Sequence, residues 1–155
     1  MDRAGYCFGS TLGKAVFDNT GCAGKSVTLS TREQRLVQRL QDQEKLLECS
    51  VNTKGTKLYV PDLAFRWELR DLPVADEHES GCIGWQVAPT PLYAGRDISS
   101  PVVSTIRPGD DVLFSHWSEG DWNYVIIQEG GWGRVKGAGW LIDKTDESTC
   151  RQWAG

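Results

Sequence analysis

The sequence contains little histidine, and its cysteines are not grouped for metal binding. Its 155 residues include two histidines, His78 and His116, and five cysteines that form no Cys-x-x-Cys pair. A structural zinc site needs about four Cys or His ligands at close spacing. A Ser or Cys hydrolase needs a base beside its nucleophile. The composition therefore predicts no metal and no cofactor, and it leaves few ways to build an enzyme.

A long apolar run is also missing. No segment approaches the roughly 20 apolar residues that cross a bilayer. The first residues, Met1-Asp2-Arg3, lack the apolar stretch of a signal peptide. We therefore expect no membrane span, and a periplasmic or secreted protein from which the signal peptide has been removed.

Positive charge is in deficit. The chain has 17 Lys and Arg against 21 Asp and Glu, and its formal net charge is −4. Such a balance argues against binding to nucleic acid, whose phosphates attract basic surfaces. It favours a basic protein partner, or it only keeps the protein in solution.

The five cysteines are odd in number and widely spaced. Two disulfides and one remaining thiol would fit an oxidising compartment. We prefer Cys7 with Cys22, which closes a short Gly-rich loop, and Cys49 with Cys82, which ties the end of a helix to the C-terminal part. Cys150 is then left over. Five reduced cysteines in a cytosolic protein are the alternative.

Residues 1–75 predict an α+β part with one helix at about 31–49. Ser30 stands three residues before Glu33, the spacing of a capping box. The apolar positions that follow recur at helical spacing, which indicates one apolar face: Leu36, Val37, Leu40 and Leu47. Short strands are expected at 14–18, 26–29, 57–60 and 64–69, the last because apolar and charged residues alternate strictly from Phe65 to Arg70.

Three arginines form a row near the start of this helix: Arg32, Arg35 and Arg39. Positive charge there opposes the helix dipole and costs some stability. The row is either a surface kept for a partner or simply a solvated face.

Residues 72–81 read as an acidic linker. Asp76, Glu77, His78 and Glu79 could be offered as metal ligands, but successive residues of an extended chain point to opposite sides and do not converge. We expect a solvated connection between the N-terminal part and the C-terminal part.

The stretch 83–142 contains short apolar runs separated by turn residues. Strands so short and so close bury their side chains by curling into a small barrel. We predict a five-stranded barrel over 83–142 and a C-terminal tail over 143–155. The whole chain is then α+β and mainly β.

The order of motifs in this stretch resembles a bacterial SH3-like (SH3b) domain. It has Leu92-Tyr93, then Ser99-Ser100-Pro101-Val102-Val103, the turn Arg107-Pro108-Gly109-Asp110, and the strand Gly120-Asp121-Trp122-Asn123-Tyr124-Val125. The family closes with one Gly-Trp-Val unit, for which Gly131-Trp132 and Gly139-Trp140 compete here. The resemblance implies a five-stranded barrel that binds peptides or proteins between two loops, here 93–100 and 117–122.

Aromatic residues are dense in this stretch, and a barrel of this size cannot enclose all of them. Rings left at the surface beside acidic loops bind extended peptides well. The predicted partner-binding residues are Tyr93, Arg96, Asp110, Asp111, Trp117, Glu119, Asp121, Trp122 and Tyr124. The alternative is that the tryptophans close the ends of the barrel; for Trp132 and Trp140 we favour that alternative.

We therefore predict a non-catalytic binding protein of the bacterial cell envelope. An acidic chain without catalytic residues fits an inhibitor or immunity protein that binds a secreted toxin or cell-wall hydrolase. Two alternatives stay open: a module that binds peptidoglycan peptide, and a small hydrolase that uses Cys82 or Cys7 as nucleophile with a histidine.

Overall fold

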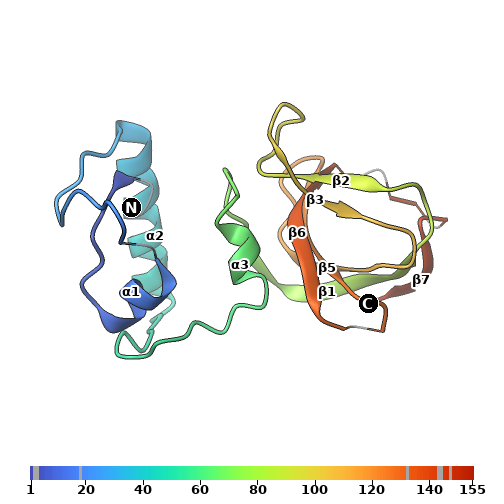
Figure 1. The fold of residues 1–155 in the computed structure, drawn as a ribbon, viewed down its shortest axis with the longest axis horizontal. Helices are drawn as coiled ribbons and strands as arrows, with labels where there is room; N and C mark the ends of the chain where they lie inside the picture. The colour runs from blue at the N-terminus through green and yellow to red at the C-terminus, as the bar shows by residue number, and fades with distance from the viewer. Residues whose placement is uncertain (2–3, 18, 132, 143–144, 147) are drawn as a thin grey trace. The chain divides into compact units, whose positions relative to one another are not determined.

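The chain forms two compact units, Met1–Tyr59 and Val60–Gly155 (Figure 1). The computed structural model describes residues 1, 4–17, 19–131, 133–142, 145–146 and 148–155. Trp132, for which we favour a place at the end of the barrel, lies outside these residues.

The first unit begins with a short helix, α1 (Thr11–Val16). The Ser10 hydroxyl accepts a hydrogen bond from the Gly13 amide, which starts the helix. Leu12 and Val16 are its buried apolar residues, and the Phe8 and Phe17 rings stack with their centroids 4.1 Å apart. The strands predicted at 14–18 and 26–29 are wrong, because residues 14–16 complete α1 and residues 26–29 pair with no strand among the described residues.

The predicted helix is present as α2 (Thr31–Leu46). Its capping box forms as expected: the Ser30 hydroxyl accepts from the Glu33 amide, and the Glu33 carboxylate accepts from the Ser30 amide at 2.7 Å. Every residue of α2 is described, and none of them is buried. The leucines of its apolar face are therefore not covered by the rest of the first unit.

The predicted strand at 64–69 is wrong; the segment contains α3 (Leu63–Arg66). Asp62 and Arg66 form an ion pair of 2.9 Å across one helical turn. Phe65 and Leu69, also four residues apart, pack into one hydrophobic cluster, whereas Trp67 between them is 42% exposed. Helical contacts thus override a pattern that alternates like a strand. The expected strand at 57–60 is also absent from the described structure.

The second unit is one antiparallel sheet. Its strands are β1 (Ala75–Trp85), β2 (Thr90–Tyr93), β3 (Val102–Ile106), β4 (Asp111–His116), β5 (Trp122–Gln128), β6 (Val135–Ile142) and β7 (Cys150–Ala154). The seven strands lie in the order β3-β2-β6-β5-β4-β1-β7. Mainly β structure with helices is therefore confirmed.

The predicted five-stranded barrel is wrong, because β3 and β7 are the two edges of the sheet and do not pair with each other in the described part of the chain. Two further strands come from segments expected to be irregular. Residues 75–81, read as a linker, form the first part of β1, and residues 150–154, read as a tail, form β7. β1 pairs with both β4 and β7, which satisfies its backbone hydrogen-bonding groups. The acidic sequence did not predict this pairing.

Glycines in β6 let the sheet curl closely on itself (Figure 1). A Cβ at Gly139 would lie 2.9 Å from the Leu92 Cβ and 2.9 Å from the Val103 Cγ2. Because real side chains do not approach so closely, only glycine allows β2 and β3 to lie against β6 here.

Both faces of the central strand β5 are buried. Val125 and Ile127 belong to a cluster with Trp85 and the two cysteines of β1 and β7. Tyr124 and Ile126 belong to a second cluster on the other face, which Phe65 and Leu69 cover. A strand covered on both sides reads as a continuous apolar run, which Trp122 to Ile127 nearly is.

Candidate functional site

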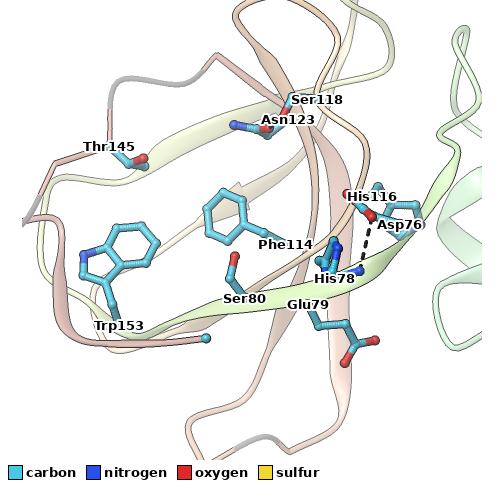
Figure 2. Close-up of a pocket in the computed structure, with 11 residues that line it drawn as sticks. Asp76, His78, Glu79, Ser80, Phe114, His116, Ser118, Asn123, Thr145 and Trp153 are labelled. Atoms are coloured by element: carbon cyan, nitrogen blue, oxygen red, sulfur yellow. Dashed lines mark hydrogen bonds between the residues drawn. The ribbon is translucent and has the colours of Figure 1, made fainter.

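An open cleft lies beside β1, β4, β5 and β7 in the second unit (Figure 2). Its volume is about 600 Å³. We call it the aromatic cleft and define it by its lining residues: Asp76, His78, Glu79, Ser80, Phe114, His116, Ser118, Asn123, Thr145, Trp153 and Gly155. A cleft of this size is large enough for a few residues of a peptide.

Two aromatic rings form its apolar wall. The Phe114 and Trp153 centroids are 5.9 Å apart, and Trp153 is 39% exposed. Phe114 is opposite Ser80 in the β1–β4 register, so the two side chains share a face of the sheet. Figure 2 shows Ser80 and both rings on one side of β1, while the Glu79 carboxylate points away from them. The wall thus presents indole and phenyl surface next to polar groups.

His116 lines the cleft but is held by hydrogen bonds. Its Nε2 lies 2.9 Å from an Arg66 Nη2, and its Nδ1 lies 3.2 Å from the Ser115 hydroxyl. Because a guanidinium can only donate, Nε2 must accept and the ring proton must sit on Nδ1. Burial, and then the charge of Arg66, lowers the pKa of His116 below its ordinary value, while Asp62 acts in the opposite direction. The basic nitrogen is occupied, so His116 is poorly placed to act as a general base.

Behind His116 lies a buried polar network. Asp62 is 0% exposed; its Oδ2 accepts from the Tyr124 hydroxyl at 2.6 Å and from Arg66 Nε at 2.9 Å, while its Oδ1 has no hydrogen-bond partner. Burial and the bond to Asp62 raise the pKa of Tyr124 far above its ordinary value. Tyr124 therefore stays protonated, and its hydrogen bond to Asp62 holds α3 against the sheet.

Four of the predicted partner-binding residues meet at the ends of β2 and β5. The Tyr93 and Trp122 rings pack edge to face with centroids 5.8 Å apart. Arg96 Nη1 is 2.8 Å from Glu119 Oε2, and the Arg96 guanidinium lies 5.3 Å from the centre of the Trp140 ring. We call Tyr93, Arg96, Glu119 and Trp122 the rim cluster. These contacts bring residues of the two loops together, and a role of the rim cluster in binding stays a prediction.

Two more of the predicted residues are exposed and three are not. Trp117 is 60% exposed and Asp121 is exposed. Tyr124, Asp110 and Asp111 are 0%, 5% and 1% exposed and cannot contact a partner directly. Each of these three side chains makes an internal hydrogen bond that the sequence does not show.

The two aspartates close turns. Asp110 accepts from the Arg107 amide at 2.8 Å and pairs with Lys136. Asp111 accepts from the amides of Gly84 and Gly131 at 2.8 and 2.6 Å. Carboxylates that accept backbone N–H groups in this way stabilise loops.

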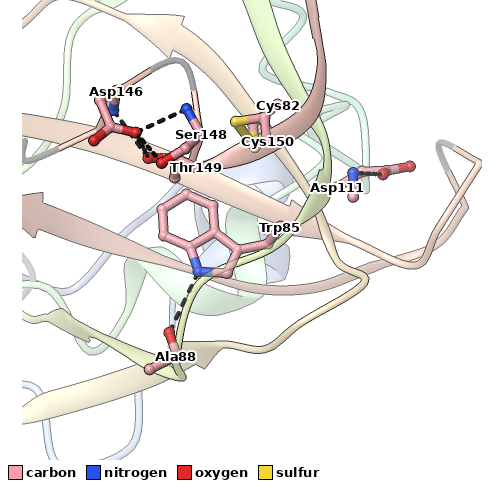
Figure 3. The surroundings of a disulfide bond; sticks show 9 residues. Cys82, Trp85, Ala88, Asp111, Asp146, Ser148, Thr149 and Cys150 are labelled. Carbon is pink, nitrogen blue, oxygen red and sulfur yellow. Dashed lines mark hydrogen bonds between the residues drawn. A yellow bond between two sulfur atoms is a disulfide. The ribbon is translucent and has the colours of Figure 1, made fainter.

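The disulfides are Cys7–Cys22 and Cys82–Cys150. The first is the pairing preferred from the sequence. The second replaces the expected Cys49–Cys82 bond, because β1 and β7 are neighbours and bring Cys82 and Cys150 together beside Trp85 (Figure 3). Cys49 is free and exposed. Cys7 and Cys82, the two candidate nucleophiles of the alternative hydrolase, are therefore both disulfide-bonded in this structure.

In the part of the chain that the structure describes, no three His, Cys, Asp or Glu side chains come close enough to hold a metal ion. Nor does any helix of that part have the length and apolar character needed to span a membrane.

Trp153, Phe114 and Ser80 were not proposed as site residues from the sequence. Trp153 was assigned to the tail, and Ser80 to the linker. The segment Cys150-Arg151-Gln152-Trp153-Ala154 does not alternate between apolar and polar residues, and it is too short to predict a strand without its partner β1.

Two family models match this chain. One described as "Domain of unknown function (DUF4453)" matches residues 48–155, and one described as "YARHG domain" matches residues 1–45. No SH3b model matches, so the resemblance to the SH3-like family is wrong: short motifs in a shared order were not specific to it. No curated protein and no solved structure matches the chain.

Proposed function

This chain belongs to the DUF4453 family, and we propose that its second unit is a non-catalytic binding domain that holds an extended, basic segment of another protein in the aromatic cleft. The observation that carries this proposal is the open wall of Phe114 and Trp153 in a cleft of about 600 Å³. Aromatic walls supply contact area at low entropic cost, and they are common where β domains bind peptides.

Charge favours a basic segment. The lining includes the carboxylate of Asp76, and no Lys or Arg occurs among the described residues that line the cleft. The chain as a whole has a net charge of −4. A cationic side chain would approach this cleft with favourable electrostatics, while an acidic peptide would be repelled.

The chemistry of the cleft supports binding rather than catalysis. The Nε2 of His116 is occupied by Arg66, and the hydroxyl of Ser118 donates to Asn123 at 2.6 Å. A nucleophile beside a base is not formed by these residues.

The disulfides support an extracytoplasmic location, periplasmic or secreted. Two disulfides in a chain of this size are common in oxidising compartments and rare in the cytosol.

An inhibitor or immunity-type role toward a secreted toxin or cell-wall hydrolase is the specific form of this proposal that the acidic chain favours. Peptidoglycan peptide is the alternative ligand. Sedimentation with purified cell-wall sacculi separates the two, because retention on the sacculi would support the alternative.

A selection from a random peptide library displayed on phage tests the cleft. The immobilised chain should enrich peptides in which Lys or Arg neighbours aromatic or aliphatic residues. Trp153→Ala should weaken binding of an enriched peptide at least about tenfold, since one large aromatic contact in a binding site is worth about 2 kcal/mol or more. Ser80→Arg, which fills the cleft with a cationic side chain, should also abolish binding.

Trp117→Ala is the matched control, because Trp117 is exposed and does not line the cleft. It should bind like the unchanged chain. If Trp117→Ala or Trp122→Ala loses binding while Trp153→Ala keeps it, the surface near the rim cluster is the site and the cleft is not. Unchanged melting temperatures show that each variant is folded.

A further inference from the structure

A row of leucines on α2 and at its C-terminal end is exposed, while Val37 beside them is half-buried. Leu36, Leu40 and Leu47 are 55%, 54% and 67% exposed. They lie on one side of the helix, because they are four and seven residues apart. Three leucines in one row on a helix surface are a contact face rather than scattered apolar residues.

The helix has little inside its own unit to stabilise it. It has 16 residues and none of them is buried. Isolated helices of about this length are marginal in water, and most helices in proteins depend on packing of one face. The buried apolar residues described in Met1–Tyr59 are Leu12 and Val16, both in α1. A partner that packs on the leucine row would bury apolar surface, of which the first unit has little.

The spacing of the row is that of a short heptad seam. Leu36, Leu40, Gln43 and Leu47 follow one another at steps of four, three and four residues, as the a and d positions of paired helices do. Arg39 and Glu44 then occupy the two flanks of the seam, at the g and e positions. We infer that α2 packs in parallel against α2 of a second copy of this chain, along Leu36, Leu40, Gln43 and Leu47.

The charges of α2 favour a second copy of this chain as the partner, with the two helices parallel. In a parallel pair each g residue faces the e residue five positions further along the other helix. Arg39 of one copy therefore faces Glu44 of the other, and symmetry forms this pair twice. In an antiparallel pair centred on the same row, Arg39 faces Leu46 and Glu44 faces Val37, and both charges lose their partner. No ion pair within the described chain involves Arg39 or Glu44.

Cys49 gives a second, independent indication. It is free and exposed three residues beyond the end of α2, in a chain whose other four cysteines are oxidised. An unpaired cysteine in such a chain points to pairing between molecules. Parallel helices place the two Cys49 residues at the same end. Antiparallel helices would separate them by roughly 20 Å at 1.5 Å per residue, which no disulfide spans.

Sedimentation equilibrium of the full chain tests the dimer, with matched variants at adjacent positions. Leu40→Glu places a charge in the seam, and Gln41→Glu places the same charge one residue away on the outer surface. We expect Leu40→Glu to raise the dimer dissociation constant at least about a hundredfold, because a leucine is withdrawn from apolar contact in both copies. Gln41→Glu should behave like the unchanged chain. A chain that is monomeric at high micromolar concentration overturns the inference.

A charge exchange tests the pairing of Arg39 with Glu44. Arg39→Glu and Glu44→Arg should each weaken the dimer several-fold, and the double variant should restore it. The two residues lie on opposite flanks of one helix and cannot pair within it, so restoration requires contact between copies. If each single variant weakens the dimer and the double variant does not restore it, the parallel arrangement is wrong.

Oxidised glutathione tests the direction. One Cys49 thiolate attacks glutathione disulfide and releases one glutathione; the second Cys49 thiolate then displaces the other glutathione and forms the intermolecular disulfide. A covalent dimer that depends on Cys49, and is lost in Leu40→Glu but kept in Gln41→Glu, supports the parallel pair. A non-covalent dimer that forms no covalent product contradicts it.

Discussion

Buried acids do structural work in the second unit. Asp62, Asp110 and Asp111 are each 5% exposed or less, and each accepts hydrogen bonds from groups distant in sequence or from a turn. A buried carboxylate is stable only where such donors replace its water. The acidic residues that the sequence offers as a partner-binding surface therefore divide into buried structural residues and exposed residues.

Asp111 and Asp121 form a matched pair for testing this division. Asp111→Ala leaves the Gly84 and Gly131 amides without their acceptor, and we expect it to lower the free energy of unfolding by about 3 kcal/mol. Asp121→Ala, at an exposed position, should change it by less than about 0.5 kcal/mol. Urea unfolding followed by tryptophan fluorescence measures both. Equal effects would contradict the buried role of Asp111.

His116 makes stability depend on pH. Burial and Arg66 lower its pKa in the folded chain, whereas the unfolded chain keeps a histidine pKa near about 6.5. The unfolded state therefore binds a proton first as pH falls, so the stabilisation is complete above about pH 6.5 and declines as pH falls from there to the folded pKa.

We expect the free energy of unfolding to decrease between about pH 6.5 and pH 5, and His116→Gln to flatten that slope, because a glutamine oxygen can accept from Arg66 without titrating. Urea titrations at several pH values measure it. His78→Gln, at an exposed position of β1, is the control and should keep the slope. If the free energy of unfolding of His116→Gln depends on pH as strongly as that of the unchanged chain, another group causes the dependence.

At the scale of elements, the Cys82–Cys150 bond joins β1 to the edge strand β7. It closes a loop of 68 residues, whereas Cys7–Cys22 closes one of 15. The loss of chain entropy in the unfolded state grows slowly with loop length, and predicts stabilisation of about 4 kcal/mol for the first bond and about 3 kcal/mol for the second.

The double variant Cys82→Ala/Cys150→Ala should shift the tryptophan-fluorescence transition in urea to clearly lower concentration. Cys7→Ala/Cys22→Ala should leave that transition in place, because all seven tryptophans follow residue 59. The second variant thus controls for loss of a disulfide as such. A shift of equal size in both would contradict independent roles for the two bonds.

At the scale of the whole molecule, the two units differ in how much they bury. Seventeen apolar residues are buried in the described chain, and two of them, Leu12 and Val16, belong to Met1–Tyr59. Burial of apolar surface is the main source of stability, so the first unit should be the weaker one.

We expect two steps on heating, with the first unit melting at lower temperature. Circular dichroism at the helix band reports chiefly α2, and tryptophan fluorescence reports only the second unit. The helix signal should fall first at low protein concentration. If the leucine row pairs between copies, higher protein concentration should raise the first transition alone. Coincident transitions at every concentration would contradict two independent units.

Features that neighbouring residues control could be predicted from the amino-acid order. The capping box of Ser30 and Glu33 with the helix that follows it, and the short Cys7–Cys22 loop, could be predicted because the partners lie close together in the sequence.

Features that depend on partners distant in the sequence become apparent in the folded chain alone. The segment 64–69 alternates like a strand but becomes α3, because Asp62 meets Tyr124 and Leu69 covers the second face of β5. The acidic residues 75–81 become part of β1 because they lie beside β4, and the last residues become β7 because they pair with residues 81–85 of β1, to which a disulfide joins them. Such pairing carries no local signal, since a strand is stabilised by a neighbour that can lie anywhere in the chain. The aromatic cleft takes part of its lining from those two strands, so it could not be predicted from the sequence.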